Sequence, residues 1–466
     1  MMSFKTLKAD LSLPTEAKEV FNTYLNAGWQ IYLVGGAVRA FLCNEIPHDF
    51  DFVTNAPEEA TASLFSNTRQ IGKAFGVMQV IVNKMSFEVA RYRAESMYVD
   101  GRKPEVIEFK NDVVEDLKRR DFTCNALIYD FEKKEIIDHF DGIIDIENKV
   151  IRAIGDPEDR LVREDCLRML RAVRFATQTG FTIESHTLRA IKNNASHIQR
   201  ISVERITEEL NKIFLSCNPY RGIRLLDKTN LLSVIMPELY TSKFFKQFSK
   251  FHKYNLFQHT IKTLSLLNGD FFSLPNDDRL TIILTLLFHD LGKMTVCEVD
   301  GDVCRYKEHS KKSTEIALVF LQKMKYSNAV IFDVLKLIEM HDYDIPETQK
   351  SCKKLLSRLG EKLLSLWKVV VFCDSGARGY KLSHKISCKL LSELDSILNE
   401  VMSSGQCYKP MQLAINGNDL IALGITDGKQ IGNILLDLFN AVLLEEVDNE
   451  KNKLIEHALS VGGNWQ

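Results

Sequence analysis

The chain lacks the features that mark membrane and secreted proteins. None of its apolar runs is long enough to span a bilayer, and its first residues, MMSFKTLKADLSLP, contain no apolar segment typical of a signal peptide. Its ten cysteines include no Cys-x-x-Cys pair. We therefore expect reduced thiols in a cytoplasmic protein that has no membrane partner.

An excess of either charge is also lacking. The 60 Lys and Arg residues nearly balance the 62 Asp and Glu residues, which leaves a formal net charge of −2. A nucleic acid would therefore have to bind at a local basic patch. The length of 466 residues corresponds to roughly three domains of about 150 residues each.

The most informative segment is YLVGGAVRAFLCNEIPHDFDFVT, residues 32–54. Ile31–Val34 is a short apolar run typical of a buried strand, and Gly35 and Gly36 end it. A helical pattern follows and places Arg39 one turn into the helix. Because glycine has no Cβ atom, backbone N–H groups at this turn can approach a polyphosphate.

Two carboxylates in the same segment predict a metal site. If residues 49–53 form a strand, Asp49 and Asp51 point to the same side of it. They repel each other unless a cation lies between them, and Mg²⁺ prefers such ligands together with substrate phosphates. The alternative is a solvated strand or turn, but the neighbouring Gly-Gly turn favours the metal site. Glu88 is either a third carboxylate of this site or part of an edge-strand salt bridge.

The remainder of the first 155 residues predicts a mixed α/β domain. We expect helices at residues 15–27 and 57–65, and strands at residues 77–82, 86–90, 126–130 and 136–139. The polar segment from Arg91 to Lys103 is expected to be a mobile loop.

Six motifs together resemble the class II tRNA nucleotidyltransferases, the CCA-adding enzymes of the DNA polymerase β-like superfamily. They are GGAVR, DFDFVT, GKAFGV, RYRAESMY, RRDFTCNAL and REDCLRMLRAVRFA, and the similarity covers about residues 1–235. The resemblance implies an α+β fold, in which a nucleotidyltransferase head with a mixed sheet and helices precedes an all-α neck and body. The sequence departs from the family at Val38-Arg39-Ala40, where members usually have Val-Arg-Asp, and this puts one local helix contact in doubt.

The resemblance also implies roles for individual residues. Two catalytic Mg²⁺ ions would bind to Asp49 and Asp51. Residues that would bind the nucleotide are Gly35, Gly36 and Arg39 at the triphosphate, Asp121 and Asn125 at the ribose, and in addition Arg120, Asp165, Arg168, Arg171 and Arg174. A flexible loop with Arg93, Glu95 and Tyr98 would switch the enzyme from C addition to A addition.

Nucleotide choice is predicted from Asp165 and Arg168, which lie three residues apart and would share one face of a continuous helix. They form either an ordinary ion pair or a reader of bases. Adenine and cytosine both present an amino donor beside a ring-nitrogen acceptor, whereas guanine and uracil present the reverse. A carboxylate and a guanidinium therefore select A and C, and in the resembling family the EDxxR motif has this role.

The predicted reaction adds C from CTP and A from ATP to the 3′ end of tRNA without a template. The RNA 3′-hydroxyl attacks the α-phosphate of the nucleotide, and pyrophosphate leaves. Basic residues between Leu188 and Lys228 would contact RNA phosphates or form a solvated face. They are Arg189, Lys192, Arg200, Arg205, Lys212, Arg221, Arg224 and Lys228.

A second metal site is predicted independently, from the motif HDLGK at residues 289–293 and distant histidines and aspartates. The set resembles the HD metal-dependent phosphohydrolase domain, whose four defining positions are His259, His289, Asp290 and Asp374. His309 and His341 could complete a second site. Imidazole and carboxylate ligands suit Mg²⁺ or a transition ion such as Mn²⁺, Ni²⁺ or Co²⁺.

The sequence predicts four domains: a nucleotidyltransferase head at 1–155, a helical RNA-binding neck at 156–240, an HD domain at 241–400, and a helical tail at 401–466 that contacts tRNA or only packs. Three functions remain open. The first is CCA addition, the second is A addition alone or poly(A) synthesis, and the third is an HD phosphohydrolase acting on RNA ends or nucleotides. The sequence does not distinguish a monomer from a dimer.

Overall fold

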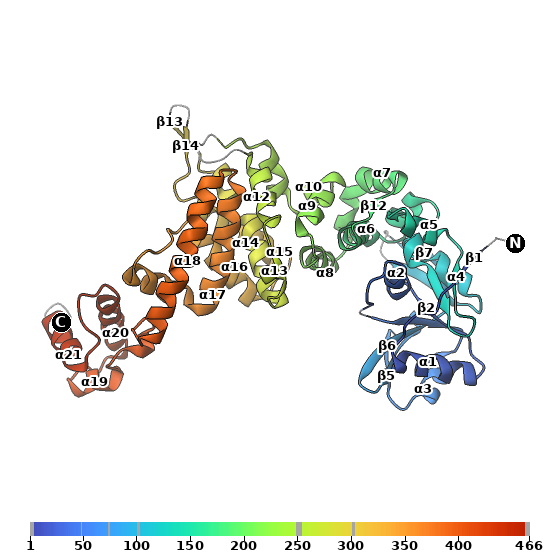
Figure 1. Ribbon diagram of the computed structural model, residues 1–466, viewed down its shortest axis with the longest axis horizontal. Coiled ribbons are helices and arrows are strands. Elements are labelled where there is room, and N and C mark those ends of the chain that lie inside the picture. Colours follow the sequence, from blue (N-terminus) through green and yellow to red (C-terminus); the bar gives the residue numbers. More distant parts are fainter. Residues whose placement is uncertain are drawn as a thin grey trace. The chain divides into compact units, whose positions relative to one another are not determined.

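The computed structural model describes residues 4–47, 49–72, 75–99, 103–247, 254–300 and 303–461. The chain divides into two compact units, Met1–Pro237 and Glu238–Gln466, which Figure 1 colours from blue to green and from green to red. The predicted division into four domains is finer and stays a prediction. Within the described residues, no helix combines the length and the apolar character needed to cross a membrane.

A mixed eight-stranded sheet forms the base of the first unit, as predicted. Its strand order is β1-β10-β9-β2-β3-β6-β5-β4, and β3 and β6 run parallel whereas the other neighbours are antiparallel. The strands are β1 Lys5–Lys8, β2 Ile31–Val34, β3 Asp51–Thr54, β4 Thr68–Gly72, β5 Val77–Val82, β6 Met85–Arg91, β9 Leu127–Asp130 and β10 Glu135–Asp138. The predicted strands are confirmed, except that β3 begins at Asp51 and not at residue 49, and β1 and β4 were not predicted.

Helices lie beside the sheet (Figure 1), and aromatic side chains pack the first of them against it. Phe21 of the first helix, Phe52 of β3 and Phe87 of β6 are fully buried, and neighbouring ring centroids lie 5.0 and 5.7 Å apart. This packing fixes β3, and with it the carboxylate at the start of that strand. The helices of this part are α1 Thr15–Asn26, α2 Gly36–Leu42, α3 Glu58–Leu64, α4 Val113–Lys118, η2 Thr123–Asn125 and α5 Gly142–Glu147.

The segment expected to be a mobile loop instead contributes to a β-hairpin. Strands β7 (Arg93–Val99) and β8 (Lys103–Phe109) pair antiparallel, and residues 100–102 lie outside the described part of the chain. Pro104 is the second residue of β8. It is compatible with β8 because an edge strand tolerates proline.

The predicted helical neck is present, but it is interrupted at the residue predicted to read bases. The π-helical segment η3 (Asp159–Glu164) ends at Asp165, whose backbone is extended with φ −145° and ψ 108°. Helix α6 then begins at Leu167, and the backbone N–H of Leu167 donates to Asp165 Oδ1 at 3.0 Å. The other elements here are β11 Val150–Ile151, β12 Thr182–Ile183, α7 Ser185–Asn194, η4 Ala195–Arg200, α8 Val203–Phe214, α9 Pro219–Lys228, α10 Leu231–Ile235 and α11 Pro237–Thr241; α6 ends at Thr179.

The second unit is helical apart from one small hairpin. Helix α14 (Asn276–Phe288) is buried at every residue from Leu280 to Phe288, which explains its uniformly apolar sequence. The remaining elements are η5 Ser242–Phe244, α12 Leu256–Leu264, α13 Gly269–Phe272, η6 Leu291–Met294, β13 Glu298–Asp300, β14 Val303–Arg305, α15 His309–Lys323, α16 Asn328–Met340, α17 Gln349–Ala377, α18 Lys381–Ser403, η7 Pro410–Gln412, α19 Gly417–Ala422, α20 Gly428–Leu443 and α21 Lys451–Val461. Helix α17 is broken at Gly360, where φ is 69°.

The cysteines do not all remain thiols. Cys297 and Cys304 form a disulfide, whereas the other eight cysteines are free. The expectation of ten thiols is therefore wrong for this pair. The two residues are seven positions apart, and the antiparallel pairing of β13 with β14 brings them together. No Cys-x-x-Cys motif in the sequence indicates this disulfide.

Candidate functional site

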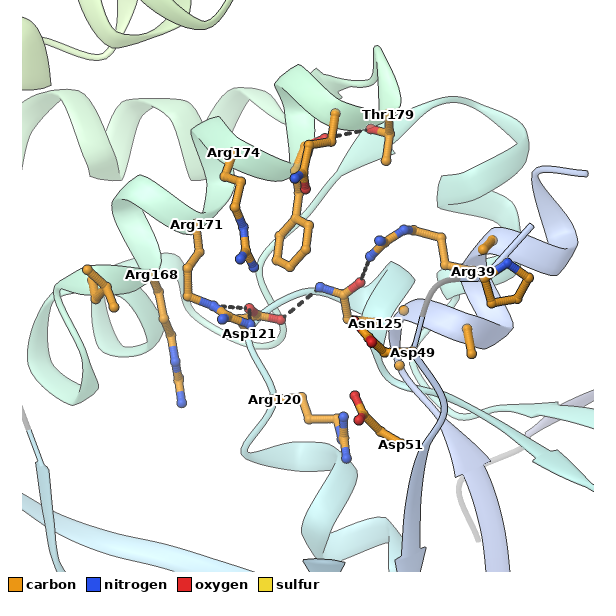
Figure 2. A pocket seen from close by; sticks show the side chains of 18 of the residues that line it. Arg39, Asp49, Asp51, Arg120, Asp121, Asn125, Arg168, Arg171, Arg174 and Thr179 are labelled. Carbon is orange, nitrogen blue, oxygen red and sulfur yellow. Dashed lines mark hydrogen bonds and ion pairs between the residues drawn. The ribbon is translucent and has the colours of Figure 1, made fainter. Parts of the chain in front are cut away.

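A pocket of about 1320 Å³ lies in the first unit, between the sheet, the β7–β8 hairpin and α6. Every residue predicted for nucleotide binding, for the metal pair and for the flexible loop lines it. These residues are Gly35, Gly36, Arg39, Asp49, Asp51, Arg93, Glu95, Tyr98, Arg120, Asp121, Asn125, Asp165, Arg168, Arg171 and Arg174. Figure 2 shows ten of the lining residues labelled. The fold thus joins segments that are more than 100 residues apart in the sequence.

The two carboxylates of the predicted metal site face the same part of the pocket (Figure 2). Asp51 is the first residue of β3, whereas Asp49 precedes the strand, so the prediction of a strand from residue 49 is wrong at its start. Asp51 lies opposite Glu88 in the parallel register of β3 and β6. Partial removal from water, the Glu88 carboxylate and, more weakly, Asp49 raise the pKa of Asp51 to about 6 against the opposing effect of Arg120. This carboxylate cluster therefore favours a bound cation.

Gly35 is required by the backbone at the junction of β2 and α2. Its φ is 76° and its ψ is −128°, a region essentially closed to residues with a Cβ atom. Its N–H donates to the Leu127 carbonyl at 3.3 Å. This N–H is therefore bonded within the fold, and Gly35 shapes the turn that begins the helix with Arg39, while phosphate binding at Gly35 and Gly36 stays a prediction.

Asp121 is held at the centre of a polar chain that crosses the pocket (Figure 2). Its Oδ2 accepts from Arg171 Nε at 2.7 Å, and its Oδ1 accepts from Asn125 Nδ2 at 3.1 Å. Arg39 Nη1 donates in turn to Asn125 Oδ1. Burial by itself would raise the pKa of Asp121, but Arg171 and Asn125 hold it well below its usual range. The structure thus contains a fixed carboxylate and amide where the resemblance implies ribose contacts.

Replacing Asp121 with Asn is expected to destabilise the first unit by about 1–3 kcal/mol at pH 7, because Arg171 loses its buried anionic partner. The pKa of Asp121 is depressed in the fold, so its contribution is present above the unfolded value of about 3.9 and is lost as the pH falls. Urea unfolding at pH 7 and pH 3 should therefore show a smaller difference from the natural chain at pH 3, which lies between the unfolded and the folded pKa. Asp10→Asn is the control, since Asp10 forms only an exposed ion pair with Lys134. An equal loss at both pH values would contradict this assignment.

Asp165 and Arg168 do not pair with each other, contrary to the simple helical prediction. Asp165 Oδ2 lies 3.0 Å from Arg205 Nη2, and Arg168 Nη1 lies 2.6 Å from Glu164 Oε2. The cause is the break at Asp165, which removes the two residues from one continuous helix. Both side chains still line the pocket. A base bound in the pocket can therefore contact both of them without a direct Asp165–Arg168 pair.

Three arginines surround one aromatic ring on the wall of the pocket. The guanidinium carbons of Arg39, Arg171 and Arg174 lie 4.9, 5.3 and 4.3 Å from the centre of the Phe175 ring. Such contacts orient cations while leaving their N–H groups available to anions. Arg174 also pairs with Glu209 of α8 at 3.1 Å. The arrangement offers concentrated positive charge to a polyphosphate.

Several residues of this pocket or its supports were not assigned to it from the sequence. Those that carry charge or an aromatic ring against the predicted residues include Arg119, Phe175, Arg205 and Glu209. The sequence could have indicated Phe175 as a pocket residue, because it follows Arg168 by seven residues and Arg171 by four. This spacing places the three side chains on one face of a helix. Arg205 was predicted only as a contact to RNA phosphates. Its pairing with Asp165, 40 positions earlier, depends on the packing of α8 against α6.

The predicted second metal site is also brought together by the fold, within the second unit. Its six side chains come from α12, the end of α14, the start of α15, the end of α16, and α17. Two groups of potential ligands share one carboxylate: the first is His259, His289, Asp290 and Asp374, and the second is Asp290, His309 and His341. All six residues are buried.

The ligand atoms of these groups have the spacing of a metal coordination shell. His259 Nε2 lies 3.0 Å from Asp374 Oδ1, and His259 and His289 Nε2 each lie 3.4 Å from Asp290 Oδ2. Asp290 Oδ1 lies 3.3 Å from His309 Nε2 and 3.4 Å from His341 Nε2. Ligands about 2.1 Å from one ion are separated by roughly 3.0–3.4 Å. The two oxygens of Asp290 therefore face two separate groups.

Hydrogen bonds from the protein orient three of these imidazoles. The Nδ1 atoms of His289, His309 and His341 lie 2.9, 2.9 and 2.6 Å from the backbone carbonyls of the third preceding residues. With Nδ1–H donating to the carbonyl, the Nε2 lone pair is directed at the shared carboxylate, as in metal sites. Gly292 of the HDLGK motif lets this segment lie close to the start of α15, where His309 is located, since a Cβ there would lie 2.2 Å from the His309 carbonyl oxygen.

Buried negative charge makes this cluster favourable for cations. Burial lowers the pKa of His289, but Asp290 and Asp374 outweigh it and raise that pKa to about 10. Lys293 Nζ lies 2.6 Å from Asp290 Oδ2, and Arg378 Nη2 lies 2.6 Å from Asp374 Oδ2. The residues present thus fit divalent cations by donor chemistry, spacing and charge.

The fold and the first pocket define a nucleotidyltransferase: a mixed sheet carries paired acids that face an arginine-rich helix. Residues 31–152 match the Poly A polymerase head domain, and residues 180–242 match the "Probable RNA and SrmB-binding site of polymerase A". Residues 309–458 match the tRNA nucleotidyltransferase domain 2 family. Similarity over nearly the full length then identifies the family: the chain belongs to the CCA-adding enzymes.

Individual relatives show how far this similarity extends. The CCA-adding enzyme of Lactobacillus helveticus is 30% identical over 439 residues, which are 94% of this chain and 95% of that protein. The crystal structure of the Bacillus stearothermophilus CCA-adding enzyme in complex with CTP superposes with a TM-score of 0.70 at 26% identity, covering 96% of this chain and 98% of that one. The Thermotoga maritima CCA-adding enzyme complexed with tRNA has a TM-score of 0.59 at 19% identity, covering 96% of each chain, and it supports the fold alone.

Proposed function

We propose that the first unit adds C, C and A in turn to the 3′ end of tRNA, using CTP and ATP and no nucleic-acid template. The observation that carries this proposal is the single pocket in which Asp49 and Asp51 face the arginines of α6 and the base-reading candidates Asp165 and Arg168. Membership in the CCA-adding family supports it, as does the CTP complex of the Bacillus stearothermophilus enzyme named above.

The lining residues suit separate parts of the nucleotide. Asp49 and Asp51 would hold Mg²⁺, which in nucleotidyl transfer activates the attacking hydroxyl and stabilises the departing pyrophosphate. Asp121 and Asn125 would accept and donate hydrogen bonds at the ribose hydroxyls. The arginines around Phe175 would neutralise the triphosphate.

Base reading would use acceptors and donors that the fold already fixes. Asp165 accepts from the Leu167 N–H and from Arg205, and a carboxylate offers only acceptors to a base. Arg168 uses three of its five N–H groups in bonds to Glu164 and to two backbone carbonyls. A base with an amino donor beside an acceptor matches this pair, whereas guanine and uracil place a donor against the guanidinium.

Stepwise extension distinguishes this proposal from its alternatives. Purified chain and Mg²⁺ would be incubated with tRNAs that end at the discriminator base, at C and at CC, each with CTP alone, ATP alone or both. We expect all three RNAs to be extended to CCA and to stop there. Addition of A only to the CC end would show an A-adding enzyme, and a long A tail would show a poly(A) polymerase.

A second activity is supported by the buried cluster around Asp290. We propose that His259, His289, Asp290 and Asp374 hold one divalent cation and that Asp290, His309 and His341 hold another. Four imidazoles favour a transition ion such as Mn²⁺, Ni²⁺ or Co²⁺ over Mg²⁺. Bound in such a site, these ions activate water for attack on phosphate esters. Lys293 and Arg378 would neutralise the phosphate, which makes this unit an HD-type phosphohydrolase.

Replacing Asp290 with Asn is expected to remove both cations, because each ligand group depends on one oxygen of this carboxylate. Metal content would be measured by mass spectrometry after loading with Mn²⁺, Ni²⁺ or Co²⁺, and hydrolysis would be measured with bis(p-nitrophenyl) phosphate and p-nitrophenyl phosphate. We expect metal content near zero and at least about a hundredfold loss of hydrolysis, with nucleotide addition unchanged. The control is Asp277→Asn, an exposed residue in the first turn of α14. Normal metal content in Asp290→Asn would contradict the assignment.

A further inference from the structure

One of the four histidines in the buried cluster is oriented from outside its own helix. The carbonyls bonded to Nδ1 of His289 and His341 lie within the helices that precede these residues, α14 and α16. His309 is the first residue of α15, and its Nδ1 lies 2.9 Å from the carbonyl oxygen of Tyr306, which precedes the helix. The direction of His309 Nε2 toward Asp290 therefore depends on the chain that leads into α15.

The turn before α15 has an unfavourable backbone conformation. Glu308, between Tyr306 and His309, has φ 57° and ψ 21°, the left-handed region that residues with a Cβ atom adopt uncommonly. Such a conformation persists only where the surrounding structure holds it. The bond that orients His309 therefore requires a restraint on the neighbouring chain.

The disulfide between Cys297 and Cys304 supplies such a restraint. It joins the chain that follows η6 to β14, and Tyr306 comes two residues after Cys304. Strands β13 and β14, which it joins (Figure 1), pair over only three residues each. A disulfide that closes a loop of seven positions stabilises a whole chain less than one that closes a long loop. Its effect is therefore mainly on the turn beside it.

A dithiol can open this disulfide. Cys297 is half-buried and Cys304 is buried, so a thiolate of the dithiol attacks Cys297 Sγ. The S–S bond breaks, and the Cys304 sulfur leaves with the electron pair and takes up a proton. The second thiolate of the dithiol then displaces the Cys297 sulfur. The dithiol becomes a cyclic disulfide, and its two electrons and two protons end on the two cysteine thiols.

We propose that the Cys297–Cys304 disulfide is a redox-sensitive switch for the cation held by Asp290, His309 and His341. This inference rests on the proposed cation sites of the second unit. The closed disulfide restrains the turn, and the turn orients His309 toward the cation. When a dithiol opens the disulfide, the turn relaxes, His309 loses its fixed orientation and the cation is bound less tightly.

Opening the disulfide should leave the rest of the second unit in place. Helix α15 is attached to η6 independently of the disulfide, because Ser313 Oγ accepts from the Gly292 N–H at 2.9 Å. The ligands His259, His289 and Asp374 lie outside both the disulfide loop and α15. The other cation should therefore be retained.

Titration with Mn²⁺ tests the switch. Mn²⁺ prefers oxygen ligands to thiolates, so cysteines freed by reduction should not add a site. The natural chain is titrated before and after treatment with dithiothreitol, which is removed by desalting under inert gas before Mn²⁺ is added, and electron paramagnetic resonance measures free Mn²⁺. We expect two ions per chain. Reduction should raise the Kd of one ion about 10- to 100-fold and change that of the other less than about threefold.

Three variants identify the route. Cys297→Ser combined with Cys304→Ser should bind Mn²⁺ as the reduced natural chain does, with or without dithiothreitol. In that double variant, Glu308→Asn should restore affinity for the weakened ion, because Asn tolerates the left-handed backbone better than Glu does. Cys217→Ser is the matched control, since Cys217 is an exposed free thiol of the first unit. It should respond to dithiothreitol as the natural chain does.

Thiol counting and the retained ion make the outcomes distinct. Alkylation and mass spectrometry should find eight thiols before reduction and ten after it, and retention of the first ion shows that the second unit is folded. Ten thiols before reduction, equal affinities in both forms, or no restoration by Glu308→Asn would overturn the inference while leaving the proposed cation sites intact. Absence of Mn²⁺ binding by the oxidised chain would overturn those sites and this inference with them.

Discussion

Replacing Asp51 with Asn should reduce nucleotide addition by about three orders of magnitude. The amide keeps the size of the side chain but removes the charge that would hold Mg²⁺ beside Asp49, and the loss of metal stabilisation is worth several kcal/mol in the transition state. The measurement is single-turnover incorporation of CTP into tRNA that lacks its last three nucleotides. Binding of the tRNA itself should change less than about threefold, since Asp51 contributes negative charge rather than a phosphate contact.

The thermal stability of the Asp51→Asn variant provides a control for this experiment. Burial, together with the Glu88 and Asp49 carboxylates, disfavours the ionised form of Asp51 and raises its pKa to about 6, so removing the charge should not lower the melting temperature. A large loss of activity in a chain of unchanged stability would therefore report on chemistry. Incorporation within tenfold of the natural chain would show that Asp51 does not hold the catalytic cation.

Replacing Asp165 with Asn should relax nucleotide selection. The amide can present a donor where the carboxylate only accepts, so it can match the carbonyl oxygen of uracil or guanine. A bidentate contact of this kind discriminates by about 1–3 kcal/mol, which corresponds to roughly 5- to 150-fold. We expect kcat/KM for CTP to fall and misincorporation of UTP to rise, so that their ratio changes by about a hundredfold.

Arg163→Gln is the control for this experiment, because Arg163 lies on the same π-helical segment but forms an exposed pair with Asp159. Arg168→Gln should resemble Asp165→Asn, since a neutral amide replaces the donor. If both variants lose CTP and UTP incorporation in equal proportion, Asp165 and Arg168 support the fold of the pocket and do not read the base.

The pattern of apolar and polar residues predicted the strands and helices that depend mainly on interactions between neighbouring residues. The strands β2, β5, β6, β9 and β10 follow from apolar runs and alternation, and α1 and α3 follow from helical periodicity. The positions of Asp49 and Asp51 in one pocket follow because their separation is short. The HDLGK motif was also informative, because its histidine, aspartate and glycine each have a separate geometric role.

The sequence predictions are wrong where contacts between residues far apart in the chain determine the local structure. Asp165 and Arg168 were expected to share one face of a continuous helix, but a break at Asp165 interrupts that helix, and Asp165 pairs with Arg205. The segment around Arg93 was expected to be a loop, but it forms strand β7, and Glu95 pairs with Arg119, 24 positions later in the chain. Neither contact has a signal in the local periodicity of the sequence.

The central claim is that protein side chains, and no template strand, choose the nucleotide in the first unit. The most direct measurement supplies all four nucleoside triphosphates at equal concentration, with Mg²⁺, to a tRNA ending at its discriminator base, and sequences the 3′ ends of the products. The account predicts that C, C and A are added in that order and that extension then stops. Products containing U or G at comparable frequency, or extension without a stop, would contradict it.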